Sequence, residues 1–199
     1  DVSQSPSTFV SANRRKKIRR VLTRVDVEEC SNVEAVLPAL RTLYDRLVER
    51  HSITGIRALS PSAFTKQLTT PGTVLFRADH GGRTVGVTVW YVQENVAYGH
   101  LAAFSDEGYQ LGASYALDWV ALEALSHRVQ WLDFGGGAGV EAGIDDGLTR
   151  YKRGWSTGTR LTYFCGRILN AEAYARLTSA ASHPRSGYFP AYRAGEFGR

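Results

Sequence analysis

The sequence predicts an α/β (α+β) domain with a mixed, mainly antiparallel sheet flanked by helices on both faces. Three β-rich segments in residues 73–104 follow one another with only tight turns between them, which is typical of an antiparallel meander. A long amphipathic segment and a buried apolar segment come next, and a strand–helix–strand connection of this kind joins parallel strands. An antiparallel meander that also contributes to a parallel pair requires a mixed sheet.

Turn residues set the boundaries of the meander and of the connection that follows it. The expected strands are Thr73–Ala78, Thr84–Gln93 and Val96–Phe104, separated by turns at His80-Gly81-Gly82 and Glu94-Asn95. A helix from about Tyr109 to His127 and a strand over Val129–Phe134 complete the crossover. The glycines from Gly135 to Gly137 end this strand.

Helical periodicity and capping residues place the remaining elements. Ser11 or Asn13 is expected to cap a basic helix that ends near Arg24. The other expected elements are a strand over Val25–Cys30, helices over Glu34–His51, Pro61–Leu68 and Leu148–Gly154, a strand over Gly158–Ile168, and a helix from Asn170 to about Ala181. We expect residues 1–10 to be a flexible arm and residues 11–199 to be a single domain, with the aromatic tail Tyr188–Arg193 docked on its body.

Composition restricts the class of protein. A chain of 199 residues with 43% hydrophobic and 22% charged residues has a globular composition. No run approaches the roughly 18 apolar residues of a membrane helix. Cys30 and Cys165 are far apart and lie in no CxxC or His/Cys cluster, so we expect two reduced thiols, no metal site and a cytoplasmic location. Because the sequence contains no methionine, we also expect a fragment or a processed form.

The formal net charge of +5 is concentrated in one helix. The segment from Arg14 to Arg24 carries seven Lys and Arg residues and no acid. Two interpretations are open. The cations form the solvated face of an amphipathic helix, or they follow the phosphates of a tRNA.

The segment from Tyr98 to Trp155 carries the pattern with the clearest chemical content. Trp131-Leu132-Asp133-Phe134-Gly135-Gly136 is followed, after a loop, by Gly147-Leu148-Thr149-Arg150-Tyr151-Lys152-Arg153-Gly154-Trp155. This pattern resembles the DFGG…GL-x-x-F-K-x-x-F signature of the Fem-like branch of the GNAT superfamily. The resemblance implies a GNAT-like fold and an intracellular acyl- or aminoacyltransferase. The branch includes transferases that use aminoacyl-tRNA to modify peptidoglycan precursors or secondary metabolites.

Two further segments are similar to this branch. Ser11–Arg20 is similar to the basic helix before its second GNAT domain, and Tyr98–Ser105 is similar to its core strand before the crossover helix. Fem-like enzymes usually carry two GNAT-like domains in tandem, whereas this chain has room for one. The chain is therefore expected to be the second half of a tandem protein or a single working module.

The resemblance implies the first group of site residues. Lys152 matches the family lysine, and an ammonium close to the donor carbonyl would stabilise the oxyanion of acyl transfer. Gly135 and Gly136 are expected to allow close approach of a ligand. Asp133 is expected at a buried strand end, either hydrogen-bonding the N–H groups of the glycine run or acting as a base.

A general base is expected on the strand Val96–Phe104 or just after it. His100 lies mid-strand, near the bulge that separates strands in GNAT proteins, and it would deprotonate an incoming ammonium or be a core histidine. Asp106, with Glu107, is the alternative base. No Ser-His-Asp or Cys-His spacing is present, which favours direct transfer within a ternary complex.

The donor is expected to bind beside the start of the crossover helix. Gln110, Gly112 and Ala113 resemble part of the Q/R-x-x-G-x-G/A loop that holds the pyrophosphate of coenzyme A in GNAT enzymes, and Arg153 is a candidate phosphate contact.

The leading interpretation is transfer from aminoacyl-tRNA, as a co-substrate without a tightly bound cofactor, to a small-molecule or peptide amine. The alternatives are an acyl-CoA-dependent N-acyltransferase and a non-catalytic GNAT-like binding domain.

Overall fold

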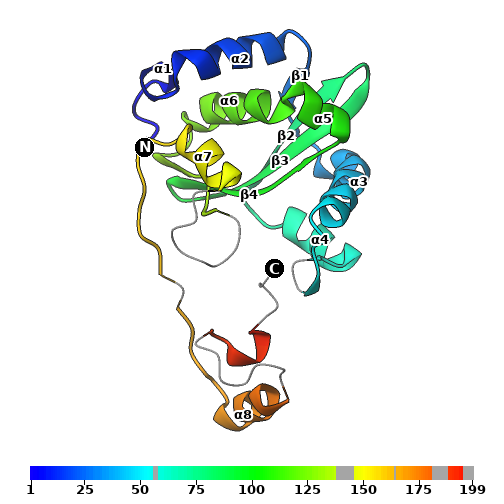
Figure 1. The fold of residues 1–199 in the computed structure, drawn as a ribbon, viewed down its shortest axis with the longest axis vertical. Coiled ribbons are helices and arrows are strands. Elements are labelled where there is room, and N and C mark those ends of the chain that lie inside the picture. Colours follow the sequence, from blue (N-terminus) through cyan, green and yellow to red (C-terminus); the bar gives the residue numbers. More distant parts are fainter. Residues whose placement is uncertain (56–57, 138–145, 164, 181–187, 195–199) are drawn as a thin grey trace.

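The computed structural model describes residues 1–55, 58–137, 146–163, 165–180 and 188–194 of the chain. Its centre is a five-stranded sheet in the order β1-β2-β3-β4-β5 (Figure 1). The strands are β1 (Asp26–Glu29), β2 (Thr73–His80), β3 (Arg83–Gln93), β4 (Val96–Phe104) and β5 (Trp131–Asp133). Strands β1 to β4 are antiparallel neighbours, and β5 pairs with β4 in parallel. The predicted mixed, mainly antiparallel sheet is therefore confirmed.

Helices cover both faces of this sheet, also as predicted (Figure 1). On one face lies α6 (Ala113–Leu125), with α2 (Ala12–Leu22) packed on its outer side. On the other lie α3 (Val33–Arg50) and α4 (Pro61–Leu68). Neighbouring residues of β3 divide between the two layers: Trp90 is buried toward α6 and Val89 toward α3 and α4. The division follows from the alternation of side chains along a strand.

The predicted helix from Tyr109 to His127 is wrong in its start and its continuity. The structure has two helices, α5 (Asp106–Leu111) and α6, and they meet at Gly112. Gly112 has φ 75°, a left-handed conformation that glycine adopts readily and that ends a helix. Ser105 starts α5 by accepting a hydrogen bond from the N–H of Gly108 at 3.0 Å. The chain therefore turns between two helices where a single one was expected.

The N-terminal ten residues, expected to form a flexible arm, contain the short helix α1 (Pro6–Phe9). The N–H of Val2 donates to the carbonyl oxygen of Gln130 at 3.0 Å. Val10 is buried between the N-terminal segment and the α6 face, in a cluster with Ile18 and Trp155. The segment thus contacts the body at both of its ends.

The C-terminal part differs most from the prediction. After α7 (Gly147–Arg153) the described residues of Gly158–Ile168 form no strand, and Leu161 and Tyr163 are each 79% exposed. A β-rich pattern becomes a strand only where a neighbouring strand accepts its hydrogen bonds, and this segment pairs with none among the described residues.

The aromatic tail packs on α8 (Ala171–Ser179) instead of the body. The N–H of Ala191, in the short helix η2 (Ala191–Arg193), donates to the hydroxyl of Tyr174 at 2.9 Å. The ring of Tyr174 also lies 6.0 Å from that of Phe189 and 5.8 Å from that of Tyr192. In Figure 1 the helices α8 and η2 lie together, apart from the sheet, at the end of an extended segment. The predicted docking on the body is therefore wrong.

Candidate active site

The most distinctive feature of the sheet is the point where β4 and β5 separate. Their pairing runs from Val96 with Trp131 to Tyr98 with Asp133, where β5 ends. From Gly99 to Phe104, β4 has no strand partner on this side among the described residues. An open strand edge offers N–H and C=O groups to an extended ligand.

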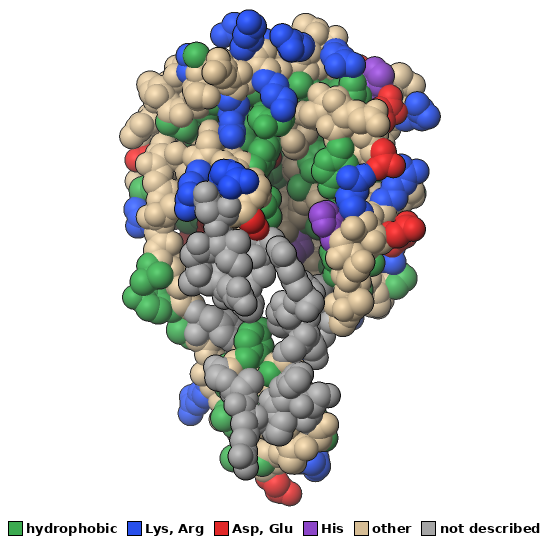
Figure 2. Space-filling view, viewed as in Figure 1, with side chains coloured by type: hydrophobic (Ala, Val, Ile, Leu, Met, Phe, Trp, Pro, Cys, Tyr) green, Lys and Arg blue, Asp and Glu red, His purple; other side chains and the backbone are tan. Residues whose placement is uncertain are grey.

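A β-bulge lies at this point. On β3, Trp90 pairs with Gly99 and Val89 pairs with Leu101, so His100 is the additional residue on β4. A bulge bends the strand and increases its local twist, which turns β4 away from β5. Figure 2 shows a hollow on this face of the molecule, between the α7 side and the α3 and α4 side, with histidine side chains visible beside it.

The α7 side of the opening, which we call the lysine side, consists of Lys152, Asp133, Gly135 and Gly136. The Lys152 ammonium donates to the carbonyl oxygen of Gly136 at 2.5 Å. A carboxylate oxygen of Asp133 accepts from the N–H of Gly135 at 2.7 Å. The sequence pattern grouped these residues and left two roles open for Asp133, a hydrogen bond to the glycine run or a base; the structure shows the hydrogen bond to Gly135, and the roles of these residues in transfer stay predictions.

The backbone conformation of the lysine side favours glycine at position 135, whereas a Cβ atom on Gly136 would meet nothing within 4 Å. Gly135 has φ 70°, and a Cβ atom there would lie 3.6 Å from Lys152 Nζ. Burial lowers the pKa of Lys152, and the carboxylates of Asp133, Asp118 and Asp146 oppose this change, with Asp133 the strongest of the three. Lys152 is thus a partly desolvated cation fixed against a glycine backbone, a suitable arrangement for stabilising an oxyanion.

The opposite side of the opening, which we call the histidine side, consists of His100, Tyr91 and Gln67. His100 Nε2 lies 2.8 Å from Gln67 Oε1 on α4, and the imidazole lies 4.6 Å from the ring of Tyr91 between centroids. An amide oxygen only accepts, so this contact places the proton on Nε2 and leaves the lone pair on Nδ1. Burial lowers the pKa of His100. The neutral form is therefore favoured near pH 7, as a proton acceptor requires.

The two sides face one opening from different layers of the fold. Lys152 belongs to α7, next to α6, whereas His100 contacts α4 on the opposite face of the sheet. The backbones that carry the two sides are close at the end of the β4–β5 pair, because a Cβ atom on Gly99, next to His100, would lie 3.4 Å from the carbonyl oxygen of Asp133.

The alternative bases lie away from this opening. Asp106 begins α5 and pairs with Arg50 of α3, and Glu107 pairs with His80 at 2.7 Å and with Arg83 at 3.3 Å. The four residue steps from His100 to Phe104 along β4 span about 13 Å. His100 is therefore much nearer than Asp106 to the end of the β4–β5 pair, where Asp133 lies.

Three of the residues expected to bind the donor lie at the junction of α5 and α6, and the fourth, Arg153, directly follows Lys152 on α7. Gln110 is exposed on α5 and Ala113 is fully buried at the start of α6. A Cβ atom on Gly112 would lie 3.6 Å from Lys17 Cε and 3.7 Å from Val21 Cγ2, so Gly112 faces α2. Arg153 lies exposed at the end of α7. Their role in donor binding remains a prediction.

The basic helix α2 divides its cations between packing and exposure. The Arg14 guanidinium lies 5.6, 5.3 and 5.0 Å from the ring centres of Tyr115, Tyr151 and Trp155 and donates to the carbonyl oxygen of Tyr151 at 2.9 Å. Arg15 donates to the carbonyl oxygen of Ser7 at 2.6 Å. The exposed cations of α2 are Lys16, Lys17, Arg19 and Arg20, and Arg24 is exposed just after the helix ends at Leu22. Figure 2 shows Lys and Arg side chains gathered along this end of the molecule, where Figure 1 places α2.

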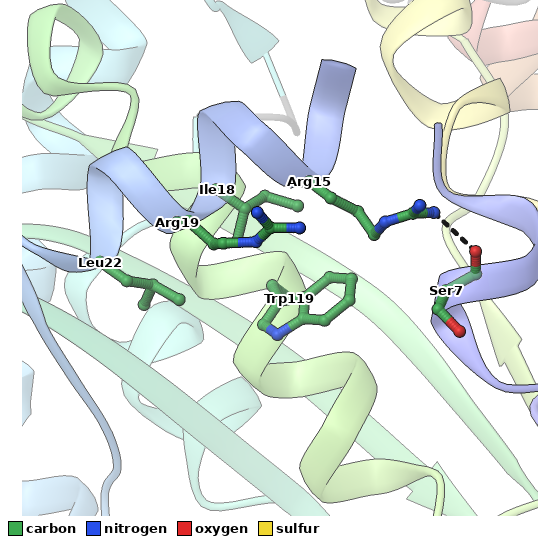
Figure 3. A pocket seen from close by; sticks show the side chains of 6 residues that line it. All are labelled: Ser7, Arg15, Ile18, Arg19, Leu22 and Trp119. Carbon is green, nitrogen blue, oxygen red and sulfur yellow. Dashed lines mark hydrogen bonds between the residues drawn. The ribbon is translucent and has the colours of Figure 1, made fainter. Parts of the chain in front are cut away.

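A shallow groove lies between α2, α6 and the N-terminal segment (Figure 3). Ile18, Leu22 and Trp119 give it an apolar lining, and Arg15 and Arg19 extend along it. The groove is thus an apolar strip bordered by positively charged side chains.

Sequence reasoning did not identify Gln67 or Asp118 as residues of this region. It included Tyr151 in the motif but gave its hydroxyl no role as a hydrogen-bond donor. Asp118 could have been found, because it is a single acid between apolar residues of α6 that face the core. Gln67 carried no comparable signal, since an exposed face of a short helix is normally polar.

The described part of the chain contains no group of three or more His, Cys, Asp or Glu side chains arranged to hold a metal ion. Cys30 and Cys165 are free thiols. Among the helices of the described residues, none is both long and apolar enough to cross a membrane.

Residues 12–153 match the family model of the acetyltransferase (GNAT) domain, and the chain therefore belongs to this family. The comparison with curated proteins gave no match.

Solved structures with the same fold include three of interest. An aminoglycoside acetyltransferase, meta-AAC0020, from an uncultured soil metagenomic sample, in complex with trehalose, has a TM-score of 0.55 and 16% identity, over 74% of this chain and 98% of that chain. FemX has a TM-score of 0.63 and 12% identity, over 77% of this chain and 56% of that chain. A ribosomal-protein-alanine N-acetyltransferase from Brucella melitensis biovar Abortus 2308 has a TM-score of 0.55 and 12% identity, over 72% of this chain and 99% of that chain. At these identities the likeness concerns the fold.

Proposed function

We propose that this GNAT-family protein transfers an aminoacyl or acyl group from an activated donor to an amine by direct attack. The observation that carries the proposal is the opening between β4 and β5, with Lys152 held against the glycine run that follows β5 and His100 at the bulge of β4. A cation for the oxyanion and a neutral imidazole for the amine proton are the two groups that such a transfer needs.

The proposed reaction proceeds in two balanced steps. His100 Nδ1 removes a proton from the ammonium of the acceptor, and the free amine attacks the donor carbonyl, forming the C–N bond and an oxyanion. The Lys152 ammonium stabilises this oxyanion. When the carbonyl reforms, the C–O or C–S bond to the carrier breaks, the attacking nitrogen gives its second proton to the leaving group, and the proton that His100 received passes to solvent. Holding both substrates at one opening supplies the proximity that direct transfer requires.

We propose aminoacyl-tRNA as the donor and thus a cytoplasmic location. The exposed cations of α2 support this donor, since they are available to RNA phosphates. Helix α2 also lies beside the lysine side, because Arg14 of this helix contacts Tyr151, the residue before Lys152. A strand of RNA that follows α2 would reach the lysine side. Acyl-CoA is the alternative donor, supported by the acetyltransferase description of the family and by the two acetyltransferases that share the fold.

We propose a small-molecule or peptide amine as the acceptor, such as a peptidoglycan precursor or a secondary metabolite. The likeness to FemX supports a peptide acceptor, and a structure of meta-AAC0020 with sisomicin supports an amino sugar.

The donor is tested by transfer of a radiolabelled group to a panel of peptide and aminoglycoside amines. Charged tRNAs and acetyl-CoA are compared, with and without RNase, and Lys152→Ala protein controls for spontaneous transfer. We expect transfer that requires charged tRNA and is lost with RNase. Transfer that survives RNase and requires acetyl-CoA would overturn the tRNA donor while retaining the transferase, and the absence of transfer from either would favour a binding domain.

RNA binding by α2 has its own test. We expect Lys16→Ala and Arg20→Ala each to weaken tRNA binding and to reduce the slope of log K against log salt by about 1. Arg24→Ala extends the series, and Arg176→Ala on α8 is the matched control outside the helix. Equal salt slopes in all variants would contradict contact between α2 and the phosphates.

A further inference from the structure

Asp118 is a buried carboxyl group with no part in the proposed chemistry. It lies in the middle of α6 among Leu117, Ala121 and Leu122, and only 7% of its surface is exposed. A carboxylate in such a place is strongly destabilising unless hydrogen bonds or opposite charges compensate its lost hydration. Its partners therefore indicate what it contributes.

The direct partner is the residue that precedes Lys152. Tyr151 donates its hydroxyl hydrogen to Asp118 Oδ2 at 2.6 Å, a distance typical of a bond to an ionised acceptor. Burial raises the pKa of Tyr151 well above its usual value, so the phenol keeps its proton and remains the donor. The interaction connects α6 to α7 across the outer edge of the opening.

Tyr151 is also held at its backbone. Arg14 of α2 donates to its carbonyl oxygen at 2.9 Å and lies over its ring at 5.3 Å. Helix α7 has only seven residues, and a helix this short is not stable alone. Its position thus depends on contacts such as these two, made from α6 and from α2.

We infer that Asp118 is a positioning residue for Lys152. By holding the Tyr151 hydroxyl, it fixes the rotation of α7 and keeps the next side chain, that of Lys152, against the glycine run. The inference rests on the proposed function insofar as it gives Lys152 a role in transfer. The fixed position of the ammonium itself requires only the contacts described.

The charge of Asp118 contributes as well. The groups that face it are Tyr151 and Lys152 on α7 and Arg14 on α2. Burial raises the pKa of Asp118 to about 7, and the Tyr151 hydrogen bond and the charges of Arg14 and Lys152 oppose that change. The carboxylate of Asp118 near Lys152 is thus present above neutral pH and lost below it.

The test observes Lys152 directly. The chain has only four lysines, Lys16, Lys17, Lys66 and Lys152, so the side-chain Cε–Hε signals of the full chain can be resolved by NMR and Lys152 assigned with Lys152→Arg. In the wild type we expect its signal to move as the pH passes about 7, the value for Asp118. In Asp118→Asn this movement should disappear, and the pKa of Lys152 should fall because a neighbouring anion is gone.

Two other variants make the test specific. Tyr151→Phe keeps the carboxylate but removes its donor, and we expect an altered or broadened Lys152 signal as α7 loses an anchor. This variant also carries the test if Asp118→Asn does not fold. Glu123→Gln removes an exposed acid from the same helix and should leave the signal unchanged. Identical Lys152 titrations in the wild type and both Asp118→Asn and Tyr151→Phe would overturn the inference.

Kinetics separate this inference from the proposed function. In the transfer assay, Asp118→Asn should reduce kcat about tenfold with a smaller effect on KM, and should change the pH profile near neutrality. If Lys152→Ala leaves the rate of transfer unchanged while the Lys152 signal of the wild type depends on Asp118, the proposed role of Lys152 in transfer fails and the positioning of Lys152 by Asp118 stands. If Lys152 is essential but Asp118→Asn changes neither signal nor pH profile, the positioning fails.

Discussion

The two sides of the opening between β4 and β5 are built differently. On the lysine side, Lys152 contacts the glycine run, and its helix is held by residues of α6 and α2. On the histidine side, His100 has one side-chain hydrogen bond, to Gln67, and one ring contact, to Tyr91. A cation that stabilises a transition state is most effective when it is fixed in advance. The lysine side is suited to that purpose, and the histidine side can adjust to an acceptor.

The largest effect is expected from removal of the cation. Lys152→Ala should lower kcat/KM for transfer about 10³-fold, because one fixed oxyanion contact has this magnitude. Lys152→Arg keeps the charge and should lose less. The measurement is steady-state transfer with the preferred donor, and equal rates for the wild type and Lys152→Ala would show that the lysine side is not catalytic.

The second largest effect is expected from the buried carboxyl group of Asp118, and it concerns stability. Burial raises the pKa of Asp118 from 3.8 to about 7, so between these values the folded protein holds a proton that the unfolded chain has released. Its contribution to the free energy of unfolding must then decrease as the pH rises from about 4 to 7, by at most about 4 kcal/mol. Asp118→Asn, compared with the wild type by urea unfolding at several pH values, should lack this decrease. Parallel pH curves would contradict it.

The histidine side should show a smaller effect with a distinct pH signature. His100→Gln should lower kcat/KM about 10²-fold, since a positioned base contributes on this scale. Only the neutral imidazole accepts a proton, and burial lowers the pKa of His100, so activity should fall only at a pH below the usual value of 6.5. The His100→Gln variant should lack this fall of activity at low pH. His127→Gln, at an exposed position, is the control and should keep both the rate and the fall of activity at low pH.

The smallest effect is expected from substitution of Gly135, with the adjacent Gly136 as the control. Gly135→Ala places a side chain at φ 70° and near Lys152 Nζ, and should lower the free energy of unfolding by about 1 kcal/mol. A Cβ atom on Gly136 meets nothing within 4 Å, so Gly136→Ala should leave stability nearly unchanged. Equal losses in the two variants, measured by denaturant unfolding, would show that backbone conformation at Gly135 is not the cause.

Much of the fold followed from local patterns. Strand β4 has the bounds that alternation and turns predicted, and α4 begins at Pro61 with Ser60 as its cap, as expected. Local signals sufficed because turns, caps and periodicity act within a few residues. The strand expected over Gly158–Ile168 failed because pairing depends on a partner elsewhere in the chain.

The sequence by itself determined the α/β class, the order along the chain of the five strands of the sheet, and the grouping of Lys152 with Asp133 and the glycine run. The tertiary structure decided which base faces that group, and which residues hold it. Asp106 is bound by Arg50, His100 lies on the bulge, and Asp118 reaches Tyr151 across 33 positions of sequence. Such contacts join residues distant in sequence, and only the packing of helices on a twisted sheet determines which of them meet.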